Sequence, residues 1–121
     1  MVDHVGFTVE NWDAARLFYV AALAPLGMAV VMEWGESAGF GVAHKPEFWV
    51  GRGPRMTPGM HIAFRAKDRA TVDAFYAAAM AAGGVDNGPP GLRPQYHAAY
   101  YGAFVRDPDG HNIEAVCHDA P

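Results

Sequence analysis

The stretch His4-Val-Gly-Phe-Thr-Val9 near the start of the chain has a close counterpart in His61-Ile-Ala-Phe-Arg-Ala66. Each stretch is followed, at the same spacing, by a run that contains an aromatic pair, Phe18-Tyr19 in the first copy and Phe75-Tyr76 in the second. A repeat of this kind predicts two copies of one unit, which fold together because neither copy buries its sheet face alone. We expect the copies to pack about a pseudo-twofold axis, which brings His4 and His61 to equivalent places.

Hydrophobic patterning and turn residues predict the order β-α-β-β-β in the first copy. A helix follows the first strand, and Asn11 is expected to cap it by accepting from a free backbone N–H group. Its apolar face carries Phe18 and Tyr19, and Pro25-Leu-Gly27 ends it. The expected strands are residues 2–9, 28–34, 40–43 and 48–51.

The second copy repeats this order. Asp68 is the expected cap of its helix, which ends near Gly83-Gly84, and Asp107-Pro-Asp-Gly110 predicts a tight turn between the last two strands. Residues 87–95 are too rich in proline and glycine for a regular element, so we expect a loop there, either a rim or lid of a cavity or a rigid connector. The expected strands are residues 60–66, 100–106 and 112–117.

The 121 residues are therefore expected to form one α+β domain, with module one at 1–53, a linker at about 52–58 and module two at 59–118. No run of eighteen apolar residues predicts a membrane span, and no N-terminal signal segment is evident. The formal charge is −4 with scattered basic residues, which argues against nucleic acid as a partner. Cys117 is the single cysteine, which fits a reducing, cytoplasmic location.

His4, His61 and the late run Arg106-Asp-Pro-Asp-Gly-His-Asn-Ile-Glu114 together resemble the vicinal-oxygen-chelate superfamily. This group includes glyoxalase I, fosfomycin-resistance proteins, extradiol dioxygenases and bleomycin-resistance proteins. The resemblance covers nearly the whole chain. It implies two βαβββ modules in pseudo-twofold arrangement, with curved mixed sheets that enclose a cavity and a divalent metal ion inside it.

Carried over by position, the resemblance implies that the metal ligands are His4, His61 and Glu114. Two imidazoles and one carboxylate occupy one face of a divalent ion, such as Zn, Ni, Mn or Fe(II), and leave its other positions open. An ion held in this way stabilises an enolate or alkoxide of a bound substrate. Each of these residues alone is more often structural than a ligand, so the prediction depends on the three together.

The sequence also departs from the glyoxalase I pattern, which has a second glutamate on the last strand of the first module. Alignment of residues 46–51 with residues 112–115 puts Trp49, or an apolar neighbour, at the place of Glu114, and Glu47 falls in a turn. The proton-transferring base of glyoxalase I therefore has no evident equivalent here. True lactoylglutathione lyase activity is not expected.

Other side chains are candidates for substrate contacts or catalysis. Tyr100 and Tyr101 join Glu114 as catalytic candidates, because strand alternation sends one phenol inward. Arg93 in the expected loop suits an anionic substrate, and His97 and Trp49 are further substrate-binding candidates. No chemistry is assigned to His44, His111 or His118.

Three functions remain open on this basis. The first is a metal-dependent lyase or isomerase that acts on a small oxygenated molecule. The second is an Fe(II) dioxygenase with the same ligands, and the third is a drug- or small-ligand-binding protein without catalysis, similar to bleomycin-resistance proteins. Relatives often pair, sometimes with a cavity built across the interface, so a homodimer is expected.

Overall fold

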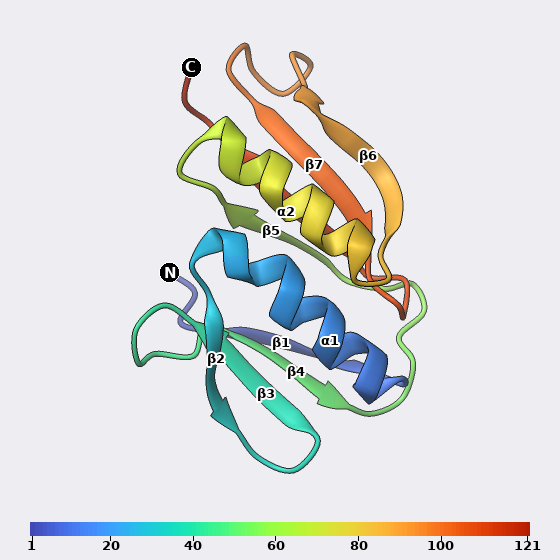
Figure 1. Ribbon diagram of the computed structural model, residues 1–121. Coiled ribbons are helices and arrows are strands. Elements are labelled where there is room, and N and C mark those ends of the chain that lie inside the picture. Colours follow the sequence, from blue (N-terminus) through green and yellow to red (C-terminus); the bar gives the residue numbers. More distant parts are fainter.

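The computed structural model describes residues 1–121. Two modules follow one another, each with the order β-α-β-β-β (Figure 1). The elements of the first module are β1 (Val5–Val9), α1 (Trp12–Leu23), a short 3₁₀ turn (Ala24–Leu26), β2 (Ala29–Glu33), β3 (Ser37–Gly41) and β4 (Phe48–Arg52). Those of the second are β5 (His61–Arg65), α2 (Arg69–Ala81), β6 (Val85–Leu92), β7 (Tyr101–Arg106) and β8 (Asn112–Cys117).

Both helices begin at the predicted caps. The side chain of Asn11 accepts a hydrogen bond from the Ala14 N–H group at 3.2 Å, and that of Asp68 accepts from the Thr71 N–H group at 2.8 Å. Each carboxamide or carboxylate thus satisfies one of the free donors of a helix N-terminus. Neither helix is long and apolar enough to span a membrane.

Each module forms a four-stranded mixed sheet. The strand orders are β1-β4-β3-β2 and β5-β8-β7-β6, so the two sheets have the same topology. In each sheet the first strand of the module runs parallel to the last, and the remaining pairs are antiparallel. The predicted α+β fold of two similar βαβββ modules is confirmed.

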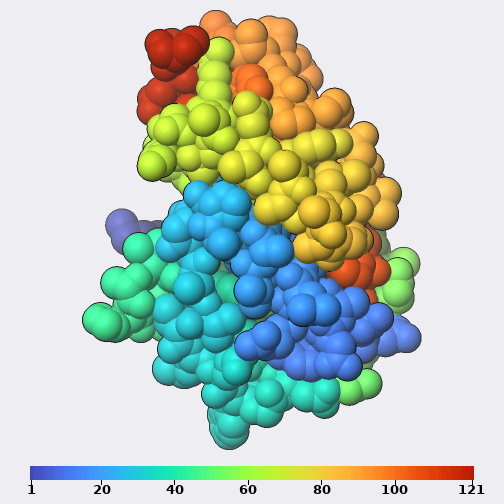
Figure 2. Space-filling view, viewed as in Figure 1, coloured from blue at the N-terminus to red at the C-terminus, as the bar shows by residue number.

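The two modules meet through their helices. In Figure 1, α1 and α2 lie side by side and run in opposite directions, and Figure 2 shows their side chains meeting across the middle of one face. A single cluster of 22 buried apolar residues draws on both modules and includes the fully buried rings of Phe18, Phe40 and Phe75. Burial of each such ring contributes about 1.5–3 kcal/mol to folding.

One prediction about the second module is wrong. The sequence predicts an irregular segment at residues 87–95, but β6 extends to Leu92 and pairs with β7, so only residues 93–95 of it are irregular. The strand lies at the edge of its sheet and has no neighbouring strand on its outer side. A proline, which has no N–H group to donate, is therefore tolerated there. Two irregularities, between Asp86 and Gly88 and between Gly88 and Gly91, absorb the residues that cannot join the ladder.

Several strand boundaries also differ from the prediction. The first strand begins at Val5 instead of Val2, and β7 begins at Tyr101 instead of Tyr100. The strand expected at 40–43 runs from Ser37 to Gly41, because Ser37 and Ala38 pair with the neighbouring strand β4. Composition alone does not reveal such ladder partners.

The turn between β7 and β8 links the two modules through buried polar groups. The Asp109 carboxylate accepts from the backbone N–H groups of Glu10 and Asn11, at 2.9 and 3.3 Å. The hydroxyl of Tyr19 on α1 donates to the buried Asp107 carboxylate at 2.5 Å. The loop that leads into α1 and the side of that helix are thus tied to the second module.

His111 belongs to the same link. Its ring is fully buried and lies 4.0 Å from that of Phe7, centroid to centroid. Nδ1 accepts from the Met60 N–H group at 2.8 Å, and Nε2 donates to the Thr8 carbonyl at 3.0 Å. Both ring nitrogens are therefore satisfied within the protein, in the neutral form of the imidazole.

Candidate functional site

His61 and Glu114 lie together on the second sheet. Parallel pairing of β5 with β8 places His61 opposite Asn112 and Ala63 opposite Glu114. The His61 Nε2 atom is 3.3 Å from Glu114 Oε1, and the Glu114 side chain is only 3% exposed. A carboxylate so deeply buried needs a hydrogen-bonding or cationic partner.

Hydrogen bonding fixes how His61 faces this carboxylate. Its Nδ1 atom lies 3.0 Å from the carbonyl oxygen of Asn112, and since a carbonyl only accepts, Nδ1 carries the hydrogen. In a neutral imidazole Nε2 then turns its lone pair toward Glu114. A histidine oriented by a backbone carbonyl in this way is typical of metal ligands.

Tyr100 holds the other oxygen of the same carboxylate. Its hydroxyl donates to Glu114 Oε2, and burial together with this hydrogen bond raises the pKa of Tyr100. The phenol is therefore protonated at neutral pH. Tyr101, the adjacent candidate, points to the opposite side of the sheet and donates to Asp73 of α2 at 2.7 Å.

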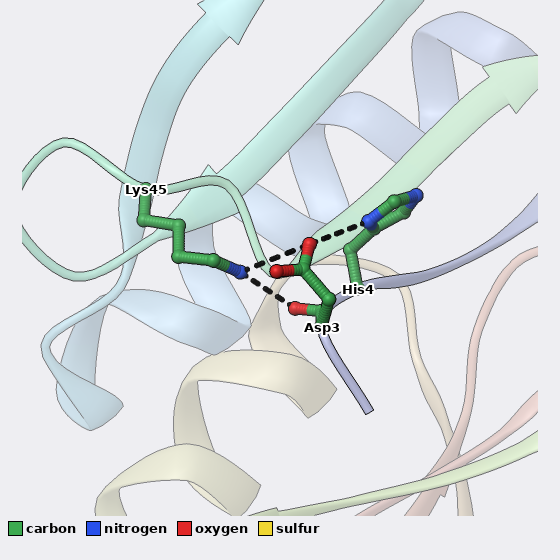
Figure 3. A network of polar contacts seen from close by, with 3 residues as sticks. All are labelled: Asp3, His4 and Lys45. Carbon is green, nitrogen blue, oxygen red and sulfur yellow. Dashed lines mark hydrogen bonds and ion pairs between the residues drawn. The ribbon is translucent and has the colours of Figure 1, made fainter. Parts of the chain in front are cut away.

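The third predicted ligand, His4, lies just before β1 in an exposed network of its own (Figure 3). Its Nδ1 atom donates to the Asp3 carboxylate at 2.8 Å, and Lys45 reaches the same carboxylate at 3.3 Å and the Asp3 carbonyl at 2.7 Å. Hydrogen bonds from His4 and Lys45 lower the pKa of the Asp3 carboxyl. As in His61, Nδ1 carries a hydrogen, so Nε2 is the ring nitrogen that a neutral His4 could offer to a metal ion.

One chain does not bring His4 to the other two predicted ligands. Strands β1 and β5 run in opposite directions in Figure 1, so they begin on opposite sides of the molecule. No three histidine, cysteine, aspartate or glutamate side chains gather closely enough to hold a metal ion. The structure therefore contains one pair, His61 and Glu114, and a separate single histidine, His4.

Trp49 occupies the place in the first module that Glu114 occupies in the second. Gly6 pairs with Trp49, as Ala63 pairs with Glu114 in the other sheet. The tryptophan side chain lies against Gly6 and Gly39, where an added Cβ would come within 3.0 and 2.9 Å of its atoms. The first module thus has an aromatic side chain, and no carboxylate, at the position equivalent to Glu114.

The remaining substrate-binding candidates lie on or beside the second sheet. The guanidinium of Arg93 lies over the ring of Phe104, 5.5 Å from its centroid. His97 Nε2 lies 2.9 Å from Nδ1 of His118, and both rings contact the ring of Tyr100.

Sequence reasoning did not identify the partners that orient these residues. Asp3 and the carbonyl of Asn112 fix the two histidines, and His118 pairs with His97. Asp3 directly precedes His4, so the carboxylate–histidine neighbours were a usable signal. The pairing of His118 with His97 depends on where the chain end lies and has no such local signal.

Comparisons with known proteins agree with the fold. The family model of the Glyoxalase/Bleomycin resistance protein/Dioxygenase superfamily matches residues 1–115. The crystal structure of a glyoxalase/bleomycin resistance protein from Albidiferax ferrireducens T118 is similar, with 27% identity, a TM-score of 0.83 and coverage of 98% of this chain and 99% of that chain. No curated protein matches the sequence significantly.

More distant structures share the fold. Lactoylglutathione lyase from Agrobacterium tumefaciens is 18% identical, with a TM-score of 0.70 and coverage of 97% of this chain and 92% of that chain. The fosfomycin resistance protein FosX from Mesorhizobium loti is 16% identical, with a TM-score of 0.73 and coverage of 98% and 92%. Because the family model spans almost the entire chain, the protein belongs to the glyoxalase/bleomycin resistance protein/dioxygenase superfamily.

Proposed function

We propose that this protein is a divalent-metal-dependent enzyme, a lyase or isomerase, that acts on a small oxygenated molecule. The observation that carries the proposal is the His61–Glu114 pair, in which the imidazole Nε2 atom and an oxygen of a buried carboxylate lie 3.3 Å apart. Membership in the superfamily supports the same function.

The donor set suits such an ion. Asn112 orients His61, Tyr100 orients Glu114 and Asp3 orients His4, and outer partners of this kind accompany metal ligands in proteins. Two imidazoles and one carboxylate leave coordination positions open to a substrate. A bound divalent ion would supply positive charge that stabilises negative charge on the substrate's oxygen atoms.

We propose that a second copy of the chain supplies the third ligand. His4 and His61 lie at the starts of antiparallel strands, so one chain offers His61 and Glu114 at one place and His4 at another. In a twofold homodimer each site would combine His61 and Glu114 with His4 of the partner subunit. Such a dimer has two equivalent sites.

The chain's own groups limit the reaction. The Tyr100 phenol holds one Glu114 oxygen and leaves the other toward His61. Trp49 stands where a second carboxylate would serve as a base. The proposed reaction therefore does not depend on two opposed glutamates, and lactoylglutathione lyase is not the activity proposed.

The test is elemental analysis of the protein purified without chelator, beside the variants His4→Ala and His61→Ala. We expect about one divalent ion per chain in the parent and none in either variant. The two variants are then mixed under conditions that exchange subunits. A mixed dimer regains one intact site, so metal content should return to about a quarter of the parent value.

Each outcome has a clear meaning. No recovery on mixing, with both variants metal-free, would contradict a site shared between copies. Full metal occupancy in His61→Ala, or a parent that takes up neither Zn, Ni, Mn nor Fe(II), would overturn the metal site itself. With Fe(II) loaded anaerobically, oxygen uptake with catechols would assign a dioxygenase instead of a lyase or isomerase.

A second function, binding of a planar ligand without catalysis, is favoured by Trp49. Its side chain packs on two glycines of the first sheet, which leaves an aromatic surface suited to stacking. Binding of a planar drug to the metal-free protein should then quench the protein's tryptophan fluorescence. The variant Trp49→Ala should not show this quenching. Equal quenching in the variant would remove the support for this function.

A further inference from the structure

Arg93 is a positioned cation without an anionic partner. Its Nη2 atom donates to the Pro89 carbonyl at 2.7 Å and Nη1 reaches the Leu92 carbonyl at 3.4 Å. No carboxylate of the chain forms an ion pair with it, whereas Arg16 and Arg52 each have a glutamate partner. The side chain is half-buried, so its charge is only partly compensated by water.

Strand β6 is shaped around this guanidinium. A Cβ added at Gly88 would lie 3.2 Å from Nη2, and one added at Gly91 would lie 3.2 Å from Nη1. The irregular pairing of β6 on both sides of Gly88 turns the Pro89 carbonyl toward the same group. The backbone thus fixes the planar guanidinium, which lowers the entropy cost of binding a ligand there.

The ring of Phe104 connects Arg93 to the candidate metal ligands. Its centroid lies 5.5 Å from the guanidinium carbon of Arg93 and 6.2 Å from that of the His61 ring. Phe104 is also the direct cross-strand partner of Glu114.

We propose that Arg93 binds the carboxylate of the substrate, and that the substrate is a small oxygenated carboxylic acid of the 2-oxo or 2-hydroxy type. A guanidinium has five N–H donors in one plane, and those not used by Pro89 and Leu92 suit a two-point contact with a carboxylate. The neighbouring oxygen of such an acid would reach toward His61 and Glu114. This second half rests on the proposed function, whereas the carboxylate site on Arg93 does not.

The test uses pyruvate as the probe and metal-free protein in the presence of a chelator. Amide signals of Gly88, Gly91 and Phe104 should shift on titration, with a dissociation constant on the order of millimolar. Arg93→Gln should weaken binding about tenfold or more, and Arg93→Lys should bind with intermediate affinity. Arg106→Gln on β7 removes the same charge from the same sheet and should leave pyruvate binding unchanged.

Methyl pyruvate is uncharged, so it separates recognition of the carboxylate from recognition of the ketone. It should bind to the parent protein no better than pyruvate binds to Arg93→Gln. The proposal is overturned if these amides do not respond to pyruvate, if Arg93→Gln binds like the parent, or if methyl pyruvate binds equally well. Thermal melting of each variant checks that it is folded. Arg93-dependent binding in a protein that takes up no metal would contradict the proposed function and leave this inference intact.

Discussion

Both histidines predicted as ligands carry their hydrogen on Nδ1, but for different reasons. In His61 the acceptor is the carbonyl of Asn112 on a paired strand, whereas in His4 it is the carboxylate of Asp3. The repeat in the sequence predicts which histidines correspond, because that needs only spacing. It does not predict their tautomers, since these depend on atoms that folding brings alongside.

Asp3 should control the tautomer of His4. We expect Asp3→Ala to raise the population of His4 with its hydrogen on Nε2, because the acceptor that holds the hydrogen on Nδ1 is lost. The nitrogen chemical shifts of the ring in the metal-free protein measure this population. In the metal-loaded dimer the same change should lower affinity about 10- to 100-fold, as loss of an outer partner does elsewhere.

The control for this prediction is Glu33→Ala, which removes a carboxylate from a comparable exposed ion pair with Arg16 in the same module. It should alter neither the His4 ring nor metal affinity. An unchanged His4 tautomer in Asp3→Ala would show that the hydrogen bond in Figure 3 does not orient the ring.

Among the elements, the helices are well predicted and β6 is not. Helix starts depend on a local cap, such as Asn11 or Asp68, whose partner lies three residues away. A strand depends on a distant partner, and pairing with β7 makes a strand of residues whose composition predicts a loop. Whether a strand lies at the edge depends on the whole sheet. The sequence alone therefore does not show that the two prolines of β6 are compatible with a strand.

Gly88 should be needed for the path of β6. Its φ of +148° is disfavoured for other residues, and an added Cβ would lie 3.0 Å from Phe104 Cδ1. We expect Gly88→Ala to lower the free energy of unfolding by about 2 kcal/mol or more, measured by urea denaturation. The control, Gly35→Ala, also has a positive φ but meets no atom within 4 Å, so about 1 kcal/mol is expected. Equal losses would mean that the contact with Phe104 adds nothing.

For the whole molecule, the repeat predicts two modules but not how they are joined. The sequence predicts that Asp107-Pro-Asp-Gly110 is a turn, but it does not predict that the carboxylates of this turn and His111 are buried. They are buried because β1, α1 and the linker pack against them. The candidate site likewise depends on how the two modules are arranged. The three ligands remain a prediction: His4 and His61 stand at corresponding places of the two modules, but the antiparallel arrangement of β1 and β5 separates them within one chain.

Tyr19 tests the link between the modules, because Tyr19→Phe removes one buried hydroxyl and keeps the ring. The Asp107 oxygen that accepts from Tyr19 would lose its donor, so the free energy of unfolding should fall by about 1–3 kcal/mol. Tyr101→Phe removes a hydroxyl bonded to the exposed Asp73 and should cost about 0.5 kcal/mol or less. Equal losses in the two variants would show that the buried link contributes no more than a surface hydrogen bond.

The difference between the parent and Tyr19→Phe should also depend on pH. Burial, followed by the charge of Asp107, raises the pKa of Tyr19 well above its ordinary value of 10.0. In alkali the unfolded chain loses this proton before the folded protein does, so the contribution of Tyr19 is complete below pH 10 and declines as the pH rises further. Urea denaturation of both proteins at pH 8 and above pH 10 measures this change. A constant difference across that range would mean that the Tyr19 hydroxyl titrates alike in the folded and unfolded states, which is incompatible with its burial against Asp107.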